Sequence, residues 1–198
     1  MIKLITQAIR QTLIWTVLTG VLYPLAITAF AQLAFHRQAN GSLVERGGQI
    51  VGSELMAQQF TGARYFWPRP SAVGYGTGPA GFSAGSGSNH GPTSAQLQTD
   101  VRNNAKALRD AHKLPADAPV PADLVYASAS GLDPHISPEA ARFQIGRVAA
   151  ARGMSEAAVA ALVERFIEPP QWGFLGEARV NVLMLNLALD AAGGPKSG

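Results

Sequence analysis

The sequence contains no cysteine among its 198 residues, and it carries little charge. Without cysteine, disulfide bonds, thiolate metal ligands and thiol nucleophiles are all excluded. Charged residues make up 15% of the chain, against about 25% in an ordinary soluble domain. This shortfall indicates that part of the chain lies outside water.

Acidic residues are missing from the N-terminal region, where Lys3, Arg10 and Arg37 are the basic residues. Removing these three from the 16 Lys+Arg leaves 13, which balance the 13 Asp+Glu, so the rest of the chain is neutral. A nucleic-acid-binding protein is expected to gather Lys and Arg on one face of its folded domain. We therefore expect no nucleic acid partner.

An uncharged apolar segment lies between Arg10 and His36. As a helix, residues 12–35 would be about 36 Å long, enough to cross a hydrocarbon core of roughly 30 Å. We therefore predict a short tail at 1–11 and a single transmembrane helix at 12–35. A cleaved signal peptide, with Ala29-Phe30-Ala31 as its cleavage site, is the alternative. The apolar run exceeds the roughly 7–15 residues of such a peptide, which favours a permanent anchor.

Basic residues flank both ends of this predicted helix, Lys3 and Arg10 before it and Arg37 and Arg46 after it. Counting them does not decide the orientation, because the numbers are equal. The amino group and the acid-free N-terminal side favour a cytoplasmic N-terminus. The domain 36–198 would then lie outside the cytoplasm.

Small or hydroxyl-bearing residues recur along the predicted helix at every fourth position. They are Thr12, Thr16, Gly20, Pro24 and Thr28, followed by Gln32. In a bilayer, small residues let two helix backbones approach closely, and hydroxyl groups form hydrogen bonds between helices. We predict that this stripe contacts a partner helix. The alternative is a lone lipid-facing anchor in which the spacing is coincidental.

The remaining domain, 36–198, is predicted to be a mixed α/β domain. Strands are expected at 50–51, at 124–128 and at Val180, and helices at 54–59, 95–112 and 138–152, then from Ser155 to Pro169 and at the C-terminus. Ser94, Ser137 and Ser155 have the residue type and position of helix N-caps. The stretch 62–91 is rich in Gly, Pro and Ser and is expected to be a long loop.

Two short stretches carry candidate chemistry. Gly85-Ser86-Gly87-Ser88-Asn89 could cradle an anion with its backbone N–H groups, although it lacks the Gly-Lys-Ser/Thr ending of a phosphate-binding loop. Ser130, Asp133 and His135 supply the groups of a hydrolase, but their crowding just before the Ser137 cap favours a structural turn. The four His residues are scattered, so no metal site is predicted.

The aromatic run Tyr65-Phe66-Trp67 leads into Pro68-Arg69-Pro70. It could cover the edge of the core, yet exposed Trp, Tyr and Arg are also the residues that interface hot spots favour. Both interpretations stay open at this stage.

Several motifs together resemble the C subunit of the Kdp-type potassium-transporting P-type ATPase, the KdpC family, over almost the whole chain. Beside the N-terminal span, they are Gly52-Ser53-Glu54-Leu55, Phe66 with Arg69-Pro70-Ser71-Ala72, Gly87-Ser88-Asn89 with Gly91-Pro92, Gly131-Leu132-Asp133-Pro134-His135-Ile136-Ser137-Pro138, Gly173-Phe174-Leu175-Gly176-Glu177, and Val180-Asn181-Val182-Leu183 with Leu185-Asn186-Leu187-Ala188-Leu189-Asp190.

This resemblance implies a non-catalytic subunit of an ATP-driven potassium uptake complex. Its partners would be a channel-like potassium-translocating subunit, an ATP-hydrolysing P-type subunit and a small membrane peptide. The family is described as a catalytic chaperone that raises the ATP affinity of the hydrolytic subunit. Because ATP is cytoplasmic, a domain outside the cytoplasm could act on ATP affinity only through the membrane subunits.

The resemblance also suggests nucleotide contacts at Gly85, Ser86, Gly87, Ser88, Asn89, Ser128, Ser130 and Gly131. This chain departs from the family pattern within these stretches, with Ser86 and Ala129 at positions where Gly is usual. ATP is therefore the one cofactor that the sequence suggests. A signal-cleaved extracytoplasmic hydrolase using Ser130, Asp133 and His135 is the alternative function.

Overall fold

The structure is a computed structural model that describes residues 1–75 and 85–193. The chain divides into two compact units, Met1–Val51 and Gly52–Gly198. The first contains a long apolar helix, and the second mixes helices with short strands, which confirms the predicted fold class. Part of the predicted loop 62–91 lies outside the described residues.

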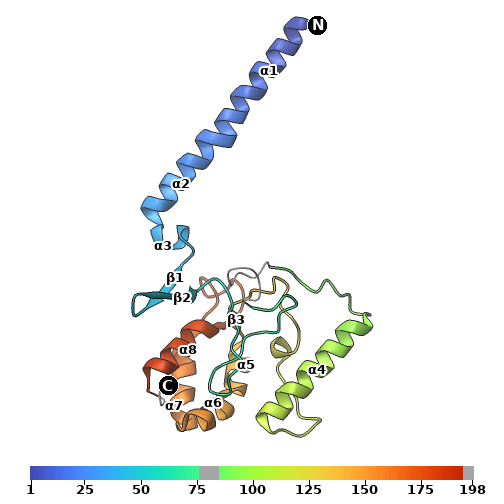
Figure 1. The fold of residues 1–198 in the computed structure, drawn as a ribbon, viewed down its shortest axis with the longest axis vertical. Helices are drawn as coiled ribbons and strands as arrows, with labels where there is room; N and C mark the ends of the chain where they lie inside the picture. Colours follow the sequence, from blue (N-terminus) through green and yellow to red (C-terminus); the bar gives the residue numbers. More distant parts are fainter. Residues whose placement is uncertain (76–84, 194–198) are drawn as a thin grey trace. The chain divides into compact units, whose positions relative to one another are not determined.

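A continuous helix dominates the first unit (Figure 1). It consists of α1 (Ile2–Val17), a π-helical turn η1 (Leu18–Leu22) and α2 (Tyr23–Ala34). The helix has 33 residues, and its most apolar 18-residue stretch has a mean hydropathy of 1.8 and is not buried within the chain, so the helix is long and apolar enough to span a membrane. It already begins at Ile2, because residues 2–11 contain no Gly or Pro that would interrupt it.

The π-helical turn has a chemical cause in Pro24. Proline has no N–H, so it cannot bond to the C=O of Gly20 four residues back, and its ring clashes with that carbonyl. The N–H of Tyr23 bonds to the C=O of Leu18, five residues back, which is the π-helical spacing. The helix is therefore widened around Gly20, one turn before Pro24.

A short helix and a hairpin follow the long helix, and the last two residues of the hairpin's second strand already belong to the second unit. They are α3 (His36–Ala39), β1 (Leu43–Arg46) and β2 (Gln49–Ser53). Gly47 and Gly48 join the two strands with φ of 60° and 79°, values that a two-residue hairpin turn needs and that glycine adopts without steric cost. The strand predicted at 50–51 is confirmed.

The second unit contains five α-helices, one 3₁₀ turn and a three-stranded sheet among its described residues. They are α4 (Ala95–His112), η3 (Ala122–Leu124), β3 (His135–Ile136), α5 (Pro138–Phe143), α6 (Ile145–Arg152), α7 (Glu156–Arg165), β4 (Ile167–Glu168), β5 (Arg179–Asn181) and α8 (Val182–Ala191). The sheet is antiparallel, with β5 in the centre. Val180 of β5 faces Ile136 of β3 on one side and Ile167 of β4 on the other. Helices α6, α7 and α8 lie beside one another (Figure 1).

The three predicted N-caps are confirmed. The hydroxyl groups of Ser94, Ser137 and Ser155 each accept a hydrogen bond from the backbone N–H three residues later. The predicted strand at Val180 and the helix after it are also confirmed, with the Asn181 side chain as the cap of α8.

Three of the predicted elements are wrong. Residues 54–56 form a turn, in which the Ser53 hydroxyl accepts the N–H of Leu55, and residues 57–59 have no regular secondary structure. Residues 124–128 follow a 3₁₀ turn and form no strand. The helix predicted at 138–152 is broken at Gln144 into α5 and α6.

The core of the second unit is apolar and centres on β5 and α8. Val180, Leu185 and Leu189 are fully buried there, together with Phe66 from the loop region. Burying a side chain of this size contributes roughly 1.5–3 kcal/mol. Phe66 therefore ties a segment without regular secondary structure to the core.

Two buried side-chain amides hold the backbone on either side of the Phe66–Trp67 peptide bond. Asn186 accepts the Phe66 N–H at 2.8 Å and donates to the Phe66 C=O at 3.0 Å. Gln144 accepts the Trp67 N–H at 2.7 Å and donates to the Trp67 C=O at 3.2 Å. We call these four hydrogen bonds the amide clamp. They satisfy buried backbone groups that would otherwise need a β-ladder.

We predict that Asn186→Ala lowers the free energy of unfolding by about 3 kcal/mol, because two buried backbone groups of Phe66 lose their partners at roughly 1–3 kcal/mol each. Urea unfolding of the full chain in detergent measures this loss. Asn103→Ala, an exposed asparagine in α4, is the matched control and should change stability by less than about 0.5 kcal/mol. Equal effects of the two substitutions would contradict the clamp.

Candidate functional site

The two Gly–Ser stretches that the sequence suggests for nucleotide binding lie directly against each other. A Cβ on Gly87 would lie 2.6 Å from the C=O oxygen of Ala129, and one on Gly131 would lie 2.6 Å from the C=O oxygen of Ser86. Gly131 also has φ of 68°, which disfavours any side chain. The structure thus brings Gly85–Gly87 and Ser128–Gly131 together. The space where a side chain on Gly87 or Gly131 would lie is occupied by other atoms of the protein.

This glycine–serine contact contains no cationic side chain of its own. The stretches 85–91 and 128–135 contain no Lys or Arg, whereas phosphate sites draw on cationic side chains or on converging N–H groups. Ser128 is 1% exposed, and its buried hydroxyl has no hydrogen-bond partner among the described residues. Ser88 lines a neighbouring cleft of about 380 Å³ whose ionisable lining residue, Asp100, would repel phosphate.

Asp133 is the electrostatic centre next to this contact. Its carboxylate pairs with Arg69 at 2.9 Å and accepts the backbone N–H of His135 at 3.0 Å. Burial opposes its ionisation, but the hydrogen bonds from His135 and Arg69 outweigh burial and lower the pKa of Asp133 from 3.8 to about 2. Asp133 therefore stays charged and closes the turn.

The hydrolase alternative receives no support from this geometry. The hydroxyl of Ser130 accepts the N–H of Leu132 at 3.1 Å and thereby closes a turn. The Nδ1 atom of His135 lies 3.7 Å from Asp133, beyond the 2.6–3.2 Å of a working hydrogen bond. In the described parts of the chain, no group of three His, Asp or Glu side chains could hold a metal ion.

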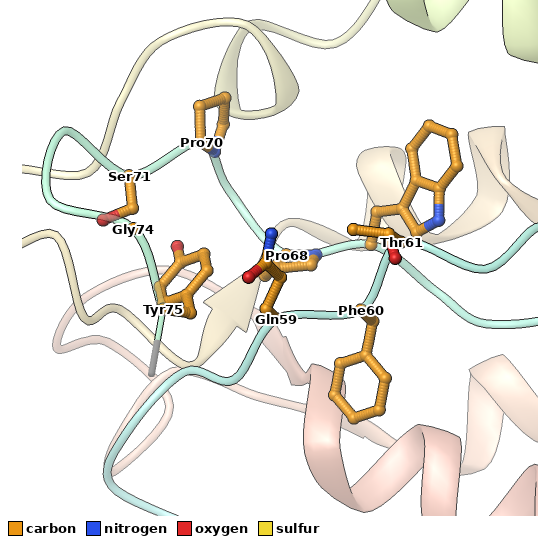
Figure 2. A pocket seen from close by; sticks show the side chains of 9 residues that line it. Gln59, Phe60, Thr61, Pro68, Pro70, Ser71, Gly74 and Tyr75 are labelled. Atoms are coloured by element: carbon orange, nitrogen blue, oxygen red, sulfur yellow. The ribbon is translucent and has the colours of Figure 1, made fainter. Parts of the chain in front are cut away.

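A pocket of about 320 Å³ opens beside the aromatic run (Figure 2). Its walls come from one loop and are lined by Gln59, Phe60, Thr61, Trp67, Pro68, Pro70, Ser71, Gly74 and Tyr75. The Tyr75 hydroxyl donates to the C=O of Arg69 at 2.6 Å, and burial together with the Asp133 charge raises the pKa of Tyr75 to about 12. The Ser71 hydroxyl donates to the C=O of Gly131 at 2.7 Å. Both hydroxyl groups thus serve the fold, and neither is placed as an acid or base.

Arg147 packs against the clamped segment. Its guanidinium lies 4.0 Å from the centre of the Trp67 ring and donates to the C=O groups of Ala63 and Tyr65 at 2.7 and 3.0 Å. Burial lowers the pKa of Arg147 to about 10, so it remains charged at neutral pH. The aromatic run therefore belongs mainly to the core edge, the first of the two interpretations.

In the first unit, the predicted helix-contact residues are all exposed. These are Thr12, Thr16, Gly20, Pro24 and Thr28. Gln32 differs from them, because its amide oxygen binds Asn40 at 3.0 Å and His36 at 3.1 Å beyond the end of α2. Its role is thus to close the end of the helix.

The sequence analysis did not assign a role to the side chains that organise the second unit, namely Gln144, Arg147, Arg152 and Asn186. Arg152 is 4% exposed, and it pairs with Asp190 at 2.9 Å and lies 5.0 Å from the centre of the Tyr65 ring. Asn186 offered a signal, since it is a lone amide in the apolar run of α8. A buried amide needs partners, which predicts a hydrogen bond but not its location.

The close contact at Gly87 yields a stability prediction. Gly87→Ala should lower the free energy of unfolding by about 1–3 kcal/mol, because the new methyl group meets the Ala129 carbonyl. Gly91→Ala is the matched control, since nothing lies within 4 Å of its Cβ position. Urea unfolding of both variants provides the comparison. An unchanged Gly87 variant would show that the two stretches are not in contact.

The low pKa of Asp133 yields a pH prediction. An unfolded Asp takes up its proton near pH 3.8, whereas the folded carboxylate does so near pH 2. Its contribution of about 2 kcal/mol is therefore complete above pH 4 and is lost as pH falls toward 2. Asp133→Asn should remove this part of the pH dependence of unfolding in urea, while Asp117→Asn, at an exposed site, should keep it. Identical pH profiles of wild type and Asp133→Asn would contradict this role.

Comparison with known proteins shows the family of the chain. A family profile described as "KdpC: K+-transporting ATPase, c chain" matches residues 5–191. The chain is 54% identical over 194 residues to the "Potassium-transporting ATPase KdpC subunit" of Methylococcus capsulatus, covering 96% of this chain and 99% of that protein. Proteins of the same description from Geobacter sulfurreducens (52%; 95% and 97% covered) and Rhodospirillum rubrum (55%; 88% and 89% covered) are similar. The chain therefore belongs to the KdpC family, the c chains of K+-transporting ATPases.

Proposed function

We propose that the chain is a non-catalytic accessory subunit of an ATP-driven potassium uptake complex in the bacterial inner membrane. Its partners are a channel-like potassium-translocating subunit, an ATP-hydrolysing P-type subunit and a small membrane peptide. The N-terminus is cytoplasmic, residues 12–35 cross the membrane, and the domain 36–198 lies outside the cytoplasm. The subunit supports assembly and acts as a catalytic chaperone that raises ATP affinity.

The main support for this proposal is the long helix, whose apolar surface is not covered by other described parts of the chain. From Ile2 to Ala34 the helix contains no residue buried in the chain. A helix of this kind is satisfied by lipid and by other membrane helices. Thr12, Thr16 and Gly20 provide a face where a partner backbone can come close, and the π-helical turn lies at its end.

The geometry of the Gly–Ser contact supports an indirect effect on ATP affinity. The glycine faces are filled by backbone, and the adjoining cleft carries the acidic Asp100. A domain outside the cytoplasm also lies across the bilayer from ATP. The subunit would then favour the ATP-binding state of the hydrolytic subunit through contacts with the membrane subunits, which is an allosteric coupling.

The assignment as a non-catalytic subunit is supported by the use of the polar groups in the second unit. Ser130, Asp133 and Arg69 are engaged in a turn and an ion pair. The pocket in Figure 2 is lined mainly by apolar and aromatic side chains, and its buried hydroxyl groups bond to backbone. Because these groups stabilise the fold, we infer that the subunit acts through contacts made by its surface.

We expect the double variant Thr16→Leu, Gly20→Leu to weaken recovery of the partner subunits, because larger side chains hold the helices apart. A loss of about 1–2 kcal/mol corresponds to a roughly five- to thirtyfold weaker association. Co-purification through a tag on this chain measures the effect. Val17→Leu with Val21→Leu is the matched control, since it enlarges a neighbouring face at the same depth. Equal recovery in both double variants would contradict the predicted contact face.

A further inference from the structure

The segment between β4 and β5 forms a tight, hydrogen-bonded turn, Pro170–Gly176, which we call the aromatic tip. Gln171 and Leu175 face each other as an antiparallel bridge, with both N–H···O=C bonds at 2.9 Å. The N–H of Gly173 donates to the C=O of Pro170 at 2.9 Å. These bonds hold the backbone of the turn that carries Trp172 and Phe174.

The backbone of the aromatic tip is held in an unfavourable conformation. Trp172 has φ of 55°, and Gly173 and Gly176 have φ of 85° and 80°. The left-handed region suits glycine but costs free energy for a tryptophan, whose Cβ approaches the following carbonyl oxygen. A strained residue persists only where surrounding structure enforces it, and such residues cluster at functional sites.

The strained turn exposes the largest aromatic surface of the second unit among its described residues. Trp172 is 78% exposed, Phe174 73% and Leu175 45%. No charged residue lies between Glu168 and Glu177. Glu168 pairs with Arg179 at 3.0 Å, and both side chains are about half exposed. An apolar centre with a polar, charged rim is the anatomy of a protein interface.

We propose that the aromatic tip is the anchor by which the second unit docks into an apolar socket on a partner subunit of the potassium-transporting complex. The inference rests on the proposed function, because it requires partner subunits. Trp172 and Phe174 fill the socket, and the Glu168–Arg179 pair lies at its rim.

The exposed area of the aromatic tip is too small for two copies of the chain to associate through their tips alone. Trp172 and Phe174 are about three-quarters exposed, so at roughly 150–250 Å² for each whole side chain they expose about 230–380 Å² together. A specific interface needs about 800 Å² per partner, so two copies meeting only at their tips would bury too little. A hot-spot anchor within a larger interface needs no more than this area. The membrane helix contributes the rest of the contact with the complex.

The rigidity and charge of the tip favour a protein over a lipid surface. A fluid lipid interface accepts aromatic side chains in many orientations, so it does not require a strained turn that fixes them. A socket of defined shape does, because a preorganised anchor loses less entropy on binding. The charged residues of the rim, Glu168, Glu177 and Arg179, also carry a net negative charge, which does not attract anionic lipids.

Photo-crosslinking in membranes that contain the whole complex tests the occupant. With benzoylphenylalanine in place of Phe174, we expect a crosslink to a partner subunit. The same probe in place of Tyr126, an exposed aromatic elsewhere on the second unit, should give none. Crosslinks from position 174 only to lipid, or only to a second copy of this chain, would overturn the proposal. Failure of the unmodified chain to co-purify with any partner would instead overturn the proposed function.

A second measurement, the recovery of partner subunits by variants of the tip, distinguishes the contribution of its backbone geometry from that of its apolar side chains. Trp172→Ser with Phe174→Ser should lower recovery of partner subunits more than tenfold, with circular dichroism unchanged. Gly173→Ala keeps both aromatic side chains and meets no atom within 4 Å, yet it strains the turn at φ of 85°. We expect it to lower recovery as well, whereas Tyr126→Ser should not. Full recovery with Gly173→Ala would exclude a socket of defined shape.

Discussion

The architecture of the second unit depends on how the backbone of Phe66 and Trp67 is satisfied away from water. This stretch has no strand partner, so side-chain amides of Asn186 and Gln144 take the place of a β-ladder. Asn186 comes from the C-terminal helix, and Gln144 from the break between α5 and α6. The amide clamp therefore joins three distant parts of the chain, and Phe66 enters the core between them.

The clamp leads to the functional account, because the other polar groups nearby are used in the same way. Asp133 closes a turn with Arg69, and the glycines of the Gly–Ser contact allow two backbones to touch. These groups stabilise the fold, which is consistent with the proposed non-catalytic role. The chain offers surfaces instead, namely an apolar helix that it does not cover and a strained aromatic tip. Both suit a subunit that acts by holding and biasing its partners.

The sequence predicted most helices of the second unit correctly. Their signals, a serine N-cap and apolar residues at helical spacing, lie within a few neighbouring residues. This is why α4 and the starts of α5 and α7 were found at Ser94, Ser137 and Ser155. The predicted strand at 124–128 was wrong because an apolar run of that length does not reveal whether a neighbouring strand exists. The amide clamp could not be predicted for a similar reason. The sequence shows that a buried Asn186 needs a hydrogen-bond partner, but not that Phe66 is that partner. The proximity of 85–87 to 129–131 was not predicted, because family resemblance suggested only that both stretches contact nucleotide.

The central claim is that the subunit acts through contacts from outside the cytoplasm and not by binding ATP itself. The absence of cysteine allows a direct test with Ala157→Cys, an exposed position at the start of α7, and a membrane-impermeant maleimide. Thr6→Cys, near the N-terminus, is the control for the opposite side. The account predicts that intact spheroplasts label position 157 and that position 6 is labelled only after lysis. Labelling of position 157 only after lysis would place the domain beside cytoplasmic ATP and contradict the account.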